Sequence, residues 1–295
     1  GGEPGIRPDI SAAEVAKAAG WDIEEVRKLK DTRKASSIMI EGAIKKVKNL
    51  LEKGELDGIL SFGGASNTTV STTVMKSLPF GIPKVMLSST AAMPAYAGGY
   101  FGTKDIAILH SVVDIAGLNP LVRDVLQRAA GMICGMVEMG EGPAILSKGE
   151  KKDLIALTEF KFSEECSSHV RHLLEERGFQ VIPFHAQGIS DRAMEELIEE
   201  GFFQGVVDIV PAGVGEELLG GNRAAGPRRL EGAGKMGIPQ LIAPCGFDML
   251  SCGPLERRYR EDPLWVSKRL IRRKLFIPDA FRVQARTTAE ELREV

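Results

Sequence analysis

A short polar segment with two glycines contains the residues whose types are best suited to binding chemistry. It follows the apolar stretch 58–62, which is typical of a buried strand. Its residues are Gly63, Gly64, Ala65, Ser66, Asn67 and Thr68. The first amides of a helix have no partner within the helix, and the helix dipole favours an anion there. The segment therefore predicts a strand–loop–helix site for a phosphate group. A plain connection is the alternative, because neither G-x-G-x-x-G nor G-x-x-x-x-G-K-[ST] is present.

A histidine and two carboxylates occur close together in the first half of the chain. Asp105, His110 and Asp114 lie within ten residues of one another. Alternation along a strand over 106–113 puts His110 and Asp114 on one face, where they could act as an acid–base pair on a phosphorylated or carboxylated metabolite. The alternative is that both side chains hydrogen-bond to nearby backbone and fix a turn. His185 follows a strand in the second half and is a third candidate.

Cys166, His169 and His172 recur at three-residue spacing, a pattern that resembles a set of metal ligands. On a helix, residues at positions i, i+3 and i+6 do not all point in the same direction, and no fourth ligand is identifiable. We therefore predict an amphipathic surface helix here and assign no metal site.

The secondary structure that must position these residues follows from the hydrophobic pattern. Apolar runs alternate with amphipathic segments along the chain, and this alternation predicts an α/β fold with mainly parallel sheets and helices on both faces. Ligands of such sheets bind beyond the carboxyl ends of the strands. We therefore expect the loops at Gly63, Ser88, His185 and Pro211 to line a cleft between two domains.

In the first half, Ser11 and Glu14 form a capping box that starts a helix, and Gly20 ends it. Asp22 starts a second helix that runs, with at most a break, to Gly54. Strands are expected at 58–62, 82–88 and 106–113, and a helix at 119–139 with Pro120 in its first turn. Asn119 is expected to cap that last helix.

Residues 140–150 are rich in Gly, Pro, Ser and Lys, which indicates a linker between domains 1–145 and 151–295. The second domain is expected to repeat the first in topology, since Gly-Ile-Pro precedes an apolar run at 81–83 and again at 237–239. Its strands are predicted at 154–157, 179–184, 206–210 and 238–243, and its helices at 163–177 and 191–200.

The composition describes an ordinary globular chain of 295 residues, with 43% hydrophobic residues, 26% charged residues and a formal net charge of −2. No stretch approaches the ~18 apolar residues of a membrane helix, and the first residues do not resemble a secretory signal. Four cysteines without a C-x-x-C pair fit reduced thiols. We expect a cytoplasmic protein that does not contact membranes.

The C-terminal region 255–286 is the basic part of the chain, with ten Arg or Lys residues against four acids. Tyr259, Trp265 and Phe276 are interleaved with these charges, a composition that also occurs in nucleic-acid-binding segments. Because the whole chain has a pI near 6.2, we favour a solvated helix face or ion pairs between subunits. Nucleic-acid binding is kept as an alternative.

Several motifs together resemble the Tm-1-like ATP-binding domain family, also called UPF0261. The most specific is His-Ser-Val-Val-Asp-Ile-Ala-Gly-Leu-Asn at 110–119. Further similar motifs are Gly63-Gly64 with Thr68, and the segments 83–86, 102–106, 184–186, 192–195, 217–221, 225–231 and 248–249. The resemblance spans nearly the whole chain.

The resemblance implies two Rossmann-like domains, a homodimer and the binding of ATP or a related nucleotide, in a family whose plant member blocks viral RNA replication. It implies no settled catalytic activity, and Mg²⁺ at the nucleotide is compatible with it but not derivable. The residues expected to line the nucleotide site are Gly63, Gly64, Ala65, Ser66, Asn67, Thr68, Ser88, Ser89, Thr90, His185, Gln187 and Gly188.

Two loops depart from the family pattern. The family has Gly-Gly-Ser-Gly-Gly-Thr where this chain has residues 63–68, and Thr-Gly-x-Gly-Gly where it has Gln-Gly-Ile-Ser-Asp at 187–191. Relative to the family, the sequence also lacks a first strand with its Asp-Thr-Lys-Gly loop, and a last strand and helix. Three hypotheses follow: a nucleotide-binding protein, which we favour, an enzyme on a phosphorylated or carboxylated metabolite, and a dimeric scaffold whose ligand site has decayed.

Overall fold

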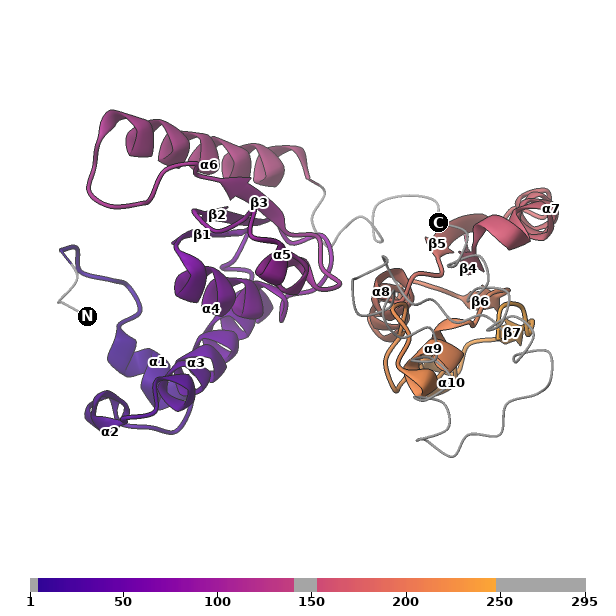
Figure 1. Ribbon diagram of the computed structural model, residues 1–295, viewed down its shortest axis with the longest axis horizontal. Helices are drawn as coiled ribbons and strands as arrows, with labels where there is room; N and C mark the ends of the chain where they lie inside the picture. The colour runs from indigo at the N-terminus through magenta and orange to yellow at the C-terminus, as the bar shows by residue number, and fades with distance from the viewer. Residues whose placement is uncertain (1–4, 141–152, 248–295) are drawn as a thin grey trace, which may run out of the picture. The chain divides into compact units, whose positions relative to one another are not determined.

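The computed structural model describes residues 5–140 and 153–247 (Figure 1). The chain divides into two compact units, Gly1–Lys148 and Gly149–Val295. Within the described ranges, no helix combines the length and the apolar character needed to cross a membrane.

The first unit opens with three helices whose starts are set by capping side chains. They are α1 (Ala12–Ala18), α2 (Ile23–Lys28) and α3 (Thr32–Glu52). Ser11 and Glu14 form the expected capping box, and the Asp22 carboxylate accepts from the amide of Glu24. The break expected after Asp22 lies at 29–31, because Asp31 caps a new helix through the amides of Arg33 and Lys34.

α1 and α3 pack closely, and a glycine makes this possible. A Cβ at Gly42 would lie 1.9 Å from the backbone oxygen of Val15. Ala16, Val26 and Ile38 form the small buried core of these helices.

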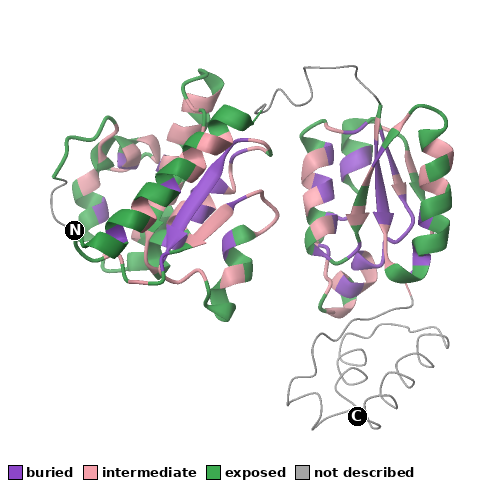
Figure 2. Cartoon of the chain, turned by 90° about the horizontal axis from the view of Figure 1, so that it is seen from above, coloured by how far each residue is buried: buried purple, intermediate pink, exposed green. Residues whose placement is uncertain are grey.

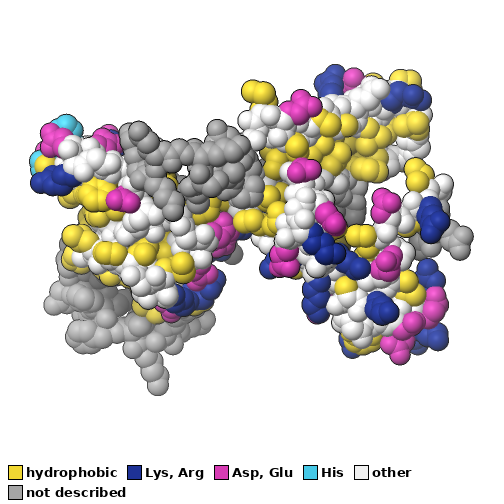
Figure 3. Space-filling model, turned by 180° about the vertical axis from the view of Figure 1, so that it is seen from behind, with side chains coloured by type: hydrophobic (Ala, Val, Ile, Leu, Met, Phe, Trp, Pro, Cys, Tyr) yellow, Lys and Arg dark blue, Asp and Glu magenta, His cyan; other side chains and the backbone are white. Residues whose placement is uncertain are grey.

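A parallel three-stranded sheet of order β1-β2-β3 follows. Its strands are β1 (Ile59–Gly63), β2 (Lys84–Ser88) and β3 (Ala107–His110), and its helices are α4 (Ala65–Met75), α5 (Pro94–Phe101) and α6 (Pro120–Met139). The central strand β2 is buried throughout. Met86 packs on Met75 of α4, and α6 lies on the other side of the sheet (Figure 1). Asn119 caps α6 as expected, and apolar side chains gather along this helix at the upper right of Figure 3.

The second unit contains a parallel sheet of order β5-β4-β6-β7. Its strands are β4 (Leu154–Glu159), β5 (Gln180–His185), β6 (Gly205–Asp208) and β7 (Gln240–Ile242). The helical elements are η2 (Lys161–Ser163), α7 (Glu164–Glu175), α8 (Ile189–Glu199), α9 (Gly213–Leu219) and α10 (Gly232–Met236). The chain builds outward first to β5 and then to β7, so the strand order reverses between β4 and β6.

Alternation along β4 builds a core on each face of this sheet. Ala156 lies in one buried cluster with Met194 and Ile198 of α8. Its neighbour Leu157 lies in the opposite cluster, against Val170 and Leu174 of α7. Figure 2 shows the buried strands of this unit between two helical layers.

The predicted α/β class with parallel sheets is confirmed, while the Rossmann-like character of the two domains stays a prediction. Most predicted strands lie within two or three residues of the observed ones. The strand expected at 106–113 is wrong in length, because it ends at His110 and Val112 has a φ of +65°. Helices α5 and α9 were not anticipated, and both are short.

Candidate functional site

The carboxyl ends of β1, β2 and β3 meet at one edge of the first sheet. Parallel pairing places Gly63 beside Ser88, and Ser88 beside His110. The loop after β1, Ser88 to Thr90 and His110 are therefore brought together, as expected for residues that follow neighbouring parallel strands.

The loop after β1 passes directly into α4. Gly63 has a φ of +154°, and a Cβ there would lie 2.8 Å from the Cβ of Asn67, so glycine is required. Asn67 donates from Nδ2 to the Phe62 carbonyl at 2.6 Å. Gly64 is the N-cap and provides no side-chain cap. The first helical bond runs from the Thr68 amide to the Gly64 oxygen at 2.9 Å, which leaves the amides of Ala65, Ser66 and Asn67 without a partner within α4.

A chain of hydroxyl groups lies behind this loop. Thr68 Oγ1 and Ser88 Oγ are 2.7 Å apart, and Ser88 Oγ is 3.2 Å from Thr90 Oγ1. Thr90 Oγ1 is 3.1 Å from the hydroxyl of Tyr100 on α5. Ser89 donates its amide to the Gly63 oxygen at 3.2 Å. Sequence reasoning missed Tyr100 because α5 itself was missed; Pro94 at its first turn was the available signal.

In the described part of the chain, no contact joins His110 and Asp114, the proposed acid–base pair. His110 is exposed, and its Nδ1 lies 3.3 Å from the Ser88 oxygen. Asp114 is exposed and accepts from the amide of Ile115 at 3.1 Å. Between them, the amide of Val113 donates to the Ser111 oxygen at 2.7 Å across Val112, which makes a tight turn with a positive central φ. Because β3 ends at His110, strand alternation does not extend to Asp114, and acid–base chemistry at these residues stays a prediction.

Asp105 lies at the opposite end of the sheet from His110. Its Oδ1 lies 2.7 Å from Nζ of Lys84, whose side chain is fully buried, and its Oδ2 accepts from the Gly81 amide at 2.9 Å. Lys84 also donates to the Pro79 and Ile82 carbonyls, both at 2.8 Å. This carboxylate is a structural partner of a buried lysine at the amino end of β2.

His185, Gln187 and Gly188 lie in the second unit, where β5 ends and α8 begins. The His185 ring stacks on Phe160, with 4.8 Å between centroids. Gly188 is the N-cap of α8 with a φ of +80°, and a Cβ there would lie 2.8 Å from the backbone of Arg223 and Ala224. Gln187 is exposed. The expectation that these residues share a cleft with the Gly63 loop stays a prediction.

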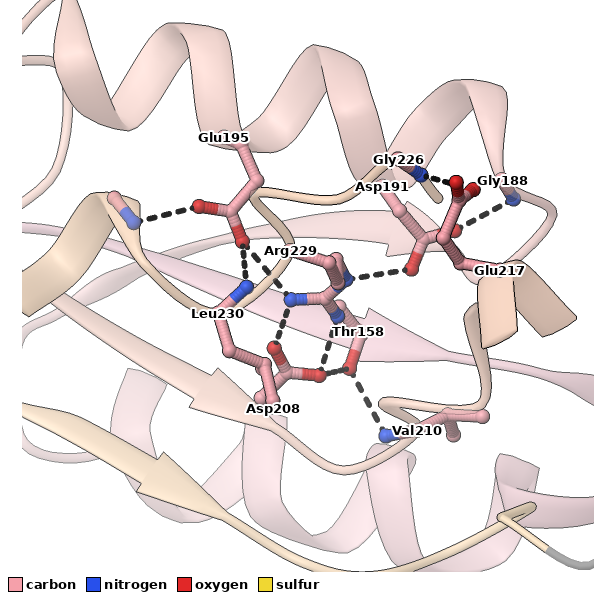
Figure 4. A network of polar contacts seen from close by, with 11 residues as sticks. Thr158, Gly188, Asp191, Glu195, Asp208, Val210, Glu217, Gly226, Arg229 and Leu230 are labelled. Atoms are coloured by element: carbon pink, nitrogen blue, oxygen red, sulfur yellow. Dashed lines mark hydrogen bonds and ion pairs between the residues drawn. The ribbon is translucent and has the colours of Figure 1, made fainter. Parts of the chain in front are cut away.

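The second unit also contains a buried ionic network that was not anticipated (Figure 4). Arg229, whose side chain is 1% exposed, donates from Nε to Asp191 at 3.1 Å and from Nη1 to Glu195 at 3.1 Å. It binds Asp208 through Nη1 at 2.5 Å and Nη2 at 2.7 Å. Asp208 also accepts from the Thr158 hydroxyl at 2.8 Å.

Backbone amides satisfy the remaining carboxylate oxygens of the network. Gly188 donates to Asp191, while Leu230 and Gly232 donate to Glu195, at 2.7 to 2.8 Å. Burial raises the pKa of Asp191, against the opposing charge of Arg229. For Arg229, burial lowers the pKa, but the hydrogen bonds and charge of Asp208 outweigh it and raise the pKa above its usual value. The network therefore ties the segment before α10 to α8, β4 and β6.

Metal binding finds no support in residues 5–140 and 153–247, where no cluster of three or more His, Cys, Asp or Glu side chains is arranged to hold an ion. Cys166 is exposed on α7, and His172 lies 3.1 Å from Glu176, one turn further along. The basic region 255–286 lies outside the described residues.

Comparison with known proteins matches both halves of the chain to one family. The N-terminal domain of the uncharacterised protein family UPF0261 matches residues 1–142, and its C-terminal domain matches residues 152–295. A UPF0261 protein of Clostridium tetani is 39% identical over 294 residues, which are 100% of this chain and 69% of that protein.

More distant relatives agree with this assignment. A UPF0261 protein of Brucella suis is 31% identical over 99% of this chain and 69% of its own length. The tomato ToMV resistance protein Tm-1(GCR237) is 33% identical over 69% of this chain and 27% of its own length. The resemblance found in the motifs thus holds over both halves, and the chain belongs to the UPF0261 family.

Proposed function

We propose that the first unit binds the phosphate groups of a nucleotide at the loop between β1 and α4. The observation that carries this proposal is the open start of α4. Three successive amides there have no hydrogen-bond partner in the described part of the chain, and Gly64 leaves the approach to them free of a side chain. The helix dipole adds partial positive charge at the same point.

Hydroxyl groups around the loop support the same proposal. Ser66 is exposed in the first turn of α4, and Ser89 and Thr90 are partly exposed beyond β2. These side chains are suitable donors to phosphate or ribose oxygens. The choice of a nucleotide over other phosphorylated molecules rests on the resemblance to the Tm-1-like ATP-binding domain family.

The departures from the family's glycine loop are compatible with binding. Asn67 stands at a position where the family has glycine, and its hydrogen bond to the Phe62 carbonyl holds the loop in place. A loop fixed by side-chain bonds loses less conformational entropy when a ligand binds than a mobile glycine loop does. We therefore favour a preorganised loop over a decayed one.

Gly64→Val tests the proposal, and we expect the variant to fold. Gly64 has a negative φ, and a Cβ there would make only an ordinary contact at 3.7 Å to Ser89 Oγ. Valine would instead cover the open amides. We expect calorimetric titration of the intact chain with ATP, ADP and AMP, with and without Mg²⁺, to show saturable binding that Gly64→Val abolishes.

Gly131→Val is the matched control, because Gly131 lies on α6 with open space around its Cβ position. It introduces the same side chain away from the loop and should leave nucleotide affinity unchanged. Equal affinity of Gly64→Val and the wild type, with both folded, would contradict the proposal.

A further inference from the structure

The segment 220–231 between α9 and α10 carries three arginines. Arg228 is exposed, whereas Arg223 and Arg229 are largely enclosed and differ in their hydrogen bonding. Every nitrogen of the Arg229 guanidinium is bound to a carboxylate, as expected of a structural residue. Arg223 is also largely enclosed, with 17% of its side chain exposed. Its guanidinium makes no hydrogen bond within the described part of the chain.

Arg223 is nevertheless held in place. Its guanidinium carbon lies 4.6 Å from the centre of the Phe160 ring. Its Nε lies 3.3 Å from Oε1 of the buried Glu216, an ion pair in which the N–H does not point along a hydrogen bond. Its backbone amide donates to Oε2 of the same carboxylate at 3.3 Å.

Such a group requires an explanation, because buried polar atoms in proteins are almost always hydrogen-bonded. Arg223 Nε is the one buried side-chain nitrogen or oxygen without a hydrogen bond among the described residues. This guanidinium is stacked and charge-paired, and its donors make no hydrogen bond to the described residues. It is therefore positioned to donate to an acceptor group of a ligand.

The position of Arg223 in the fold also favours a role in ligand binding. Phe160 directly follows β4, and Glu216 lies on α9, which follows β6. These are the two strands between which the strand order reverses. In open parallel sheets, ligands bind at the carboxyl ends of the strands at this point.

We propose that Arg223 is the anion-binding side chain of a second ligand site, at the carboxyl ends of β4 and β6, that takes the phosphate or carboxylate group of a small molecule. The planar guanidinium matches the paired oxygens of either group. Phe160 and the exposed His185 stacked on it form the adjoining wall. Glu216 is the counter-ion that holds Arg223 when no ligand is bound.

The Arg229 network positions this site. It fixes the segment that carries Arg223, through Asp208 at the end of β6 and Asp191 in the first turn of α8. Ala225 packs closely on Gly213 of α9. A Cβ added at Gly213 would lie 2.4 Å from the Cβ of Ala225. Arg223 is therefore anchored on both sides.

Hydrogen exchange of the intact chain, followed by mass spectrometry, tests the proposal. The probes are inorganic pyrophosphate and malonate, each compared with sodium chloride at equal ionic strength. We expect at least one of them to slow exchange in peptides covering 213–231, with a saturable dependence on concentration. Protection by pyrophosphate assigns a phosphate group, and protection by malonate assigns a carboxylate.

A variant that tests the role of Arg223 must not leave the carboxylate of Glu216 buried without its cation. Arg223→Gln combined with Glu216→Gln removes both charges, and thermal unfolding checks that it is folded. We expect this double variant to bind the protecting anion at least about tenfold more weakly, since it loses charge-assisted hydrogen bonds. Arg228→Gln, at an exposed neighbouring arginine, should bind as the wild type does.

Three results would overturn the proposal, two of which concern the anions and the double variant. One is the absence of protection in 213–231 by either anion, and the other is equal protection of the wild type and the folded double variant. Gly64→Val should retain the effect, because the site is independent of the loop before α4. Its loss in that variant would also refute a second site.

Discussion

At the scale of single residues, Arg229 shows how the charge balance of a buried cluster controls protonation. One guanidinium faces three carboxylates, from Asp191, Glu195 and Asp208. Asp208 holds two of the guanidinium nitrogens, whereas Asp191 holds only Nε. The raised pKa of Asp191 follows from this arrangement, because its burial is not fully offset by the shared cation.

This raised pKa predicts a pH dependence of stability. The folded state binds a proton on Asp191 more tightly than the unfolded state, whose ordinary pKa is 3.8. The contribution of Asp191 to stability is therefore fully present below that value and is lost as pH rises through the folded pKa. In Asp191→Asn this loss is absent. Urea unfolding at a series of pH values should show the wild type losing stability relative to the variant as pH rises, whereas a constant difference would contradict the assignment.

At the scale of elements, glycines in helices have opposite roles in α3 and α6. Gly42 lies where α3 crosses α1, and its missing Cβ is what lets the Val15 backbone approach. Gly131 lies on α6 with nothing near its Cβ position. Helix propensity favours alanine at both sites, so packing alone distinguishes them.

We predict opposite effects of alanine at these two glycines. Gly131→Ala should stabilise the first unit by about 0.5 to 1 kcal/mol, because alanine loses less backbone entropy in a helix. Gly42→Ala should destabilise it by about 1 to 3 kcal/mol, because the new methyl group overpacks against backbone that cannot move without shifting α1. Denaturant unfolding of both variants measures the change in the free energy of unfolding. Stabilisation by Gly42→Ala would contradict the prediction and show that α1 is free to move.

At the scale of the whole molecule, each unit has its own hydrophobic core and its own parallel sheet. The Arg229 network lies entirely in the second unit, where it joins β4, α8 and β6 to the segment before α10. Breaking it should therefore affect the second unit far more than the first.

Arg229→Met tests this expectation. Removing the guanidinium leaves three carboxylates buried without a cation, which should destabilise the second unit by about 3 to 5 kcal/mol. Hydrogen exchange should accelerate in β4 to β7 and remain unchanged in β1 to β3. Arg228→Met removes only an exposed pair with Glu199 and should cost less than about 1 kcal/mol. Equal effects of the two variants would show that the network is not a stabilising unit.

Local features were predictable from the sequence because their causes lie within a few residues. Ser11 and Glu14 cap α1 through each other, and Asp22 caps α2 through an amide two residues on. The apolar runs identified every strand of both sheets. The end of β3 was not predictable, because Val112 takes a positive φ that β-branched residues rarely adopt.

The sequence by itself determined the α/β class, the family and the loop at the start of α4, since these depend on patterns along a continuous stretch of chain. Only the tertiary structure decided which charged residues are buried and which partners they have. Arg229 meets carboxylates 21, 34 and 38 residues away, and Arg223 stacks on Phe160 from a different element. Such contacts depend on strand order and helix packing, and in the sequence these arginines look no different from the exposed Arg228.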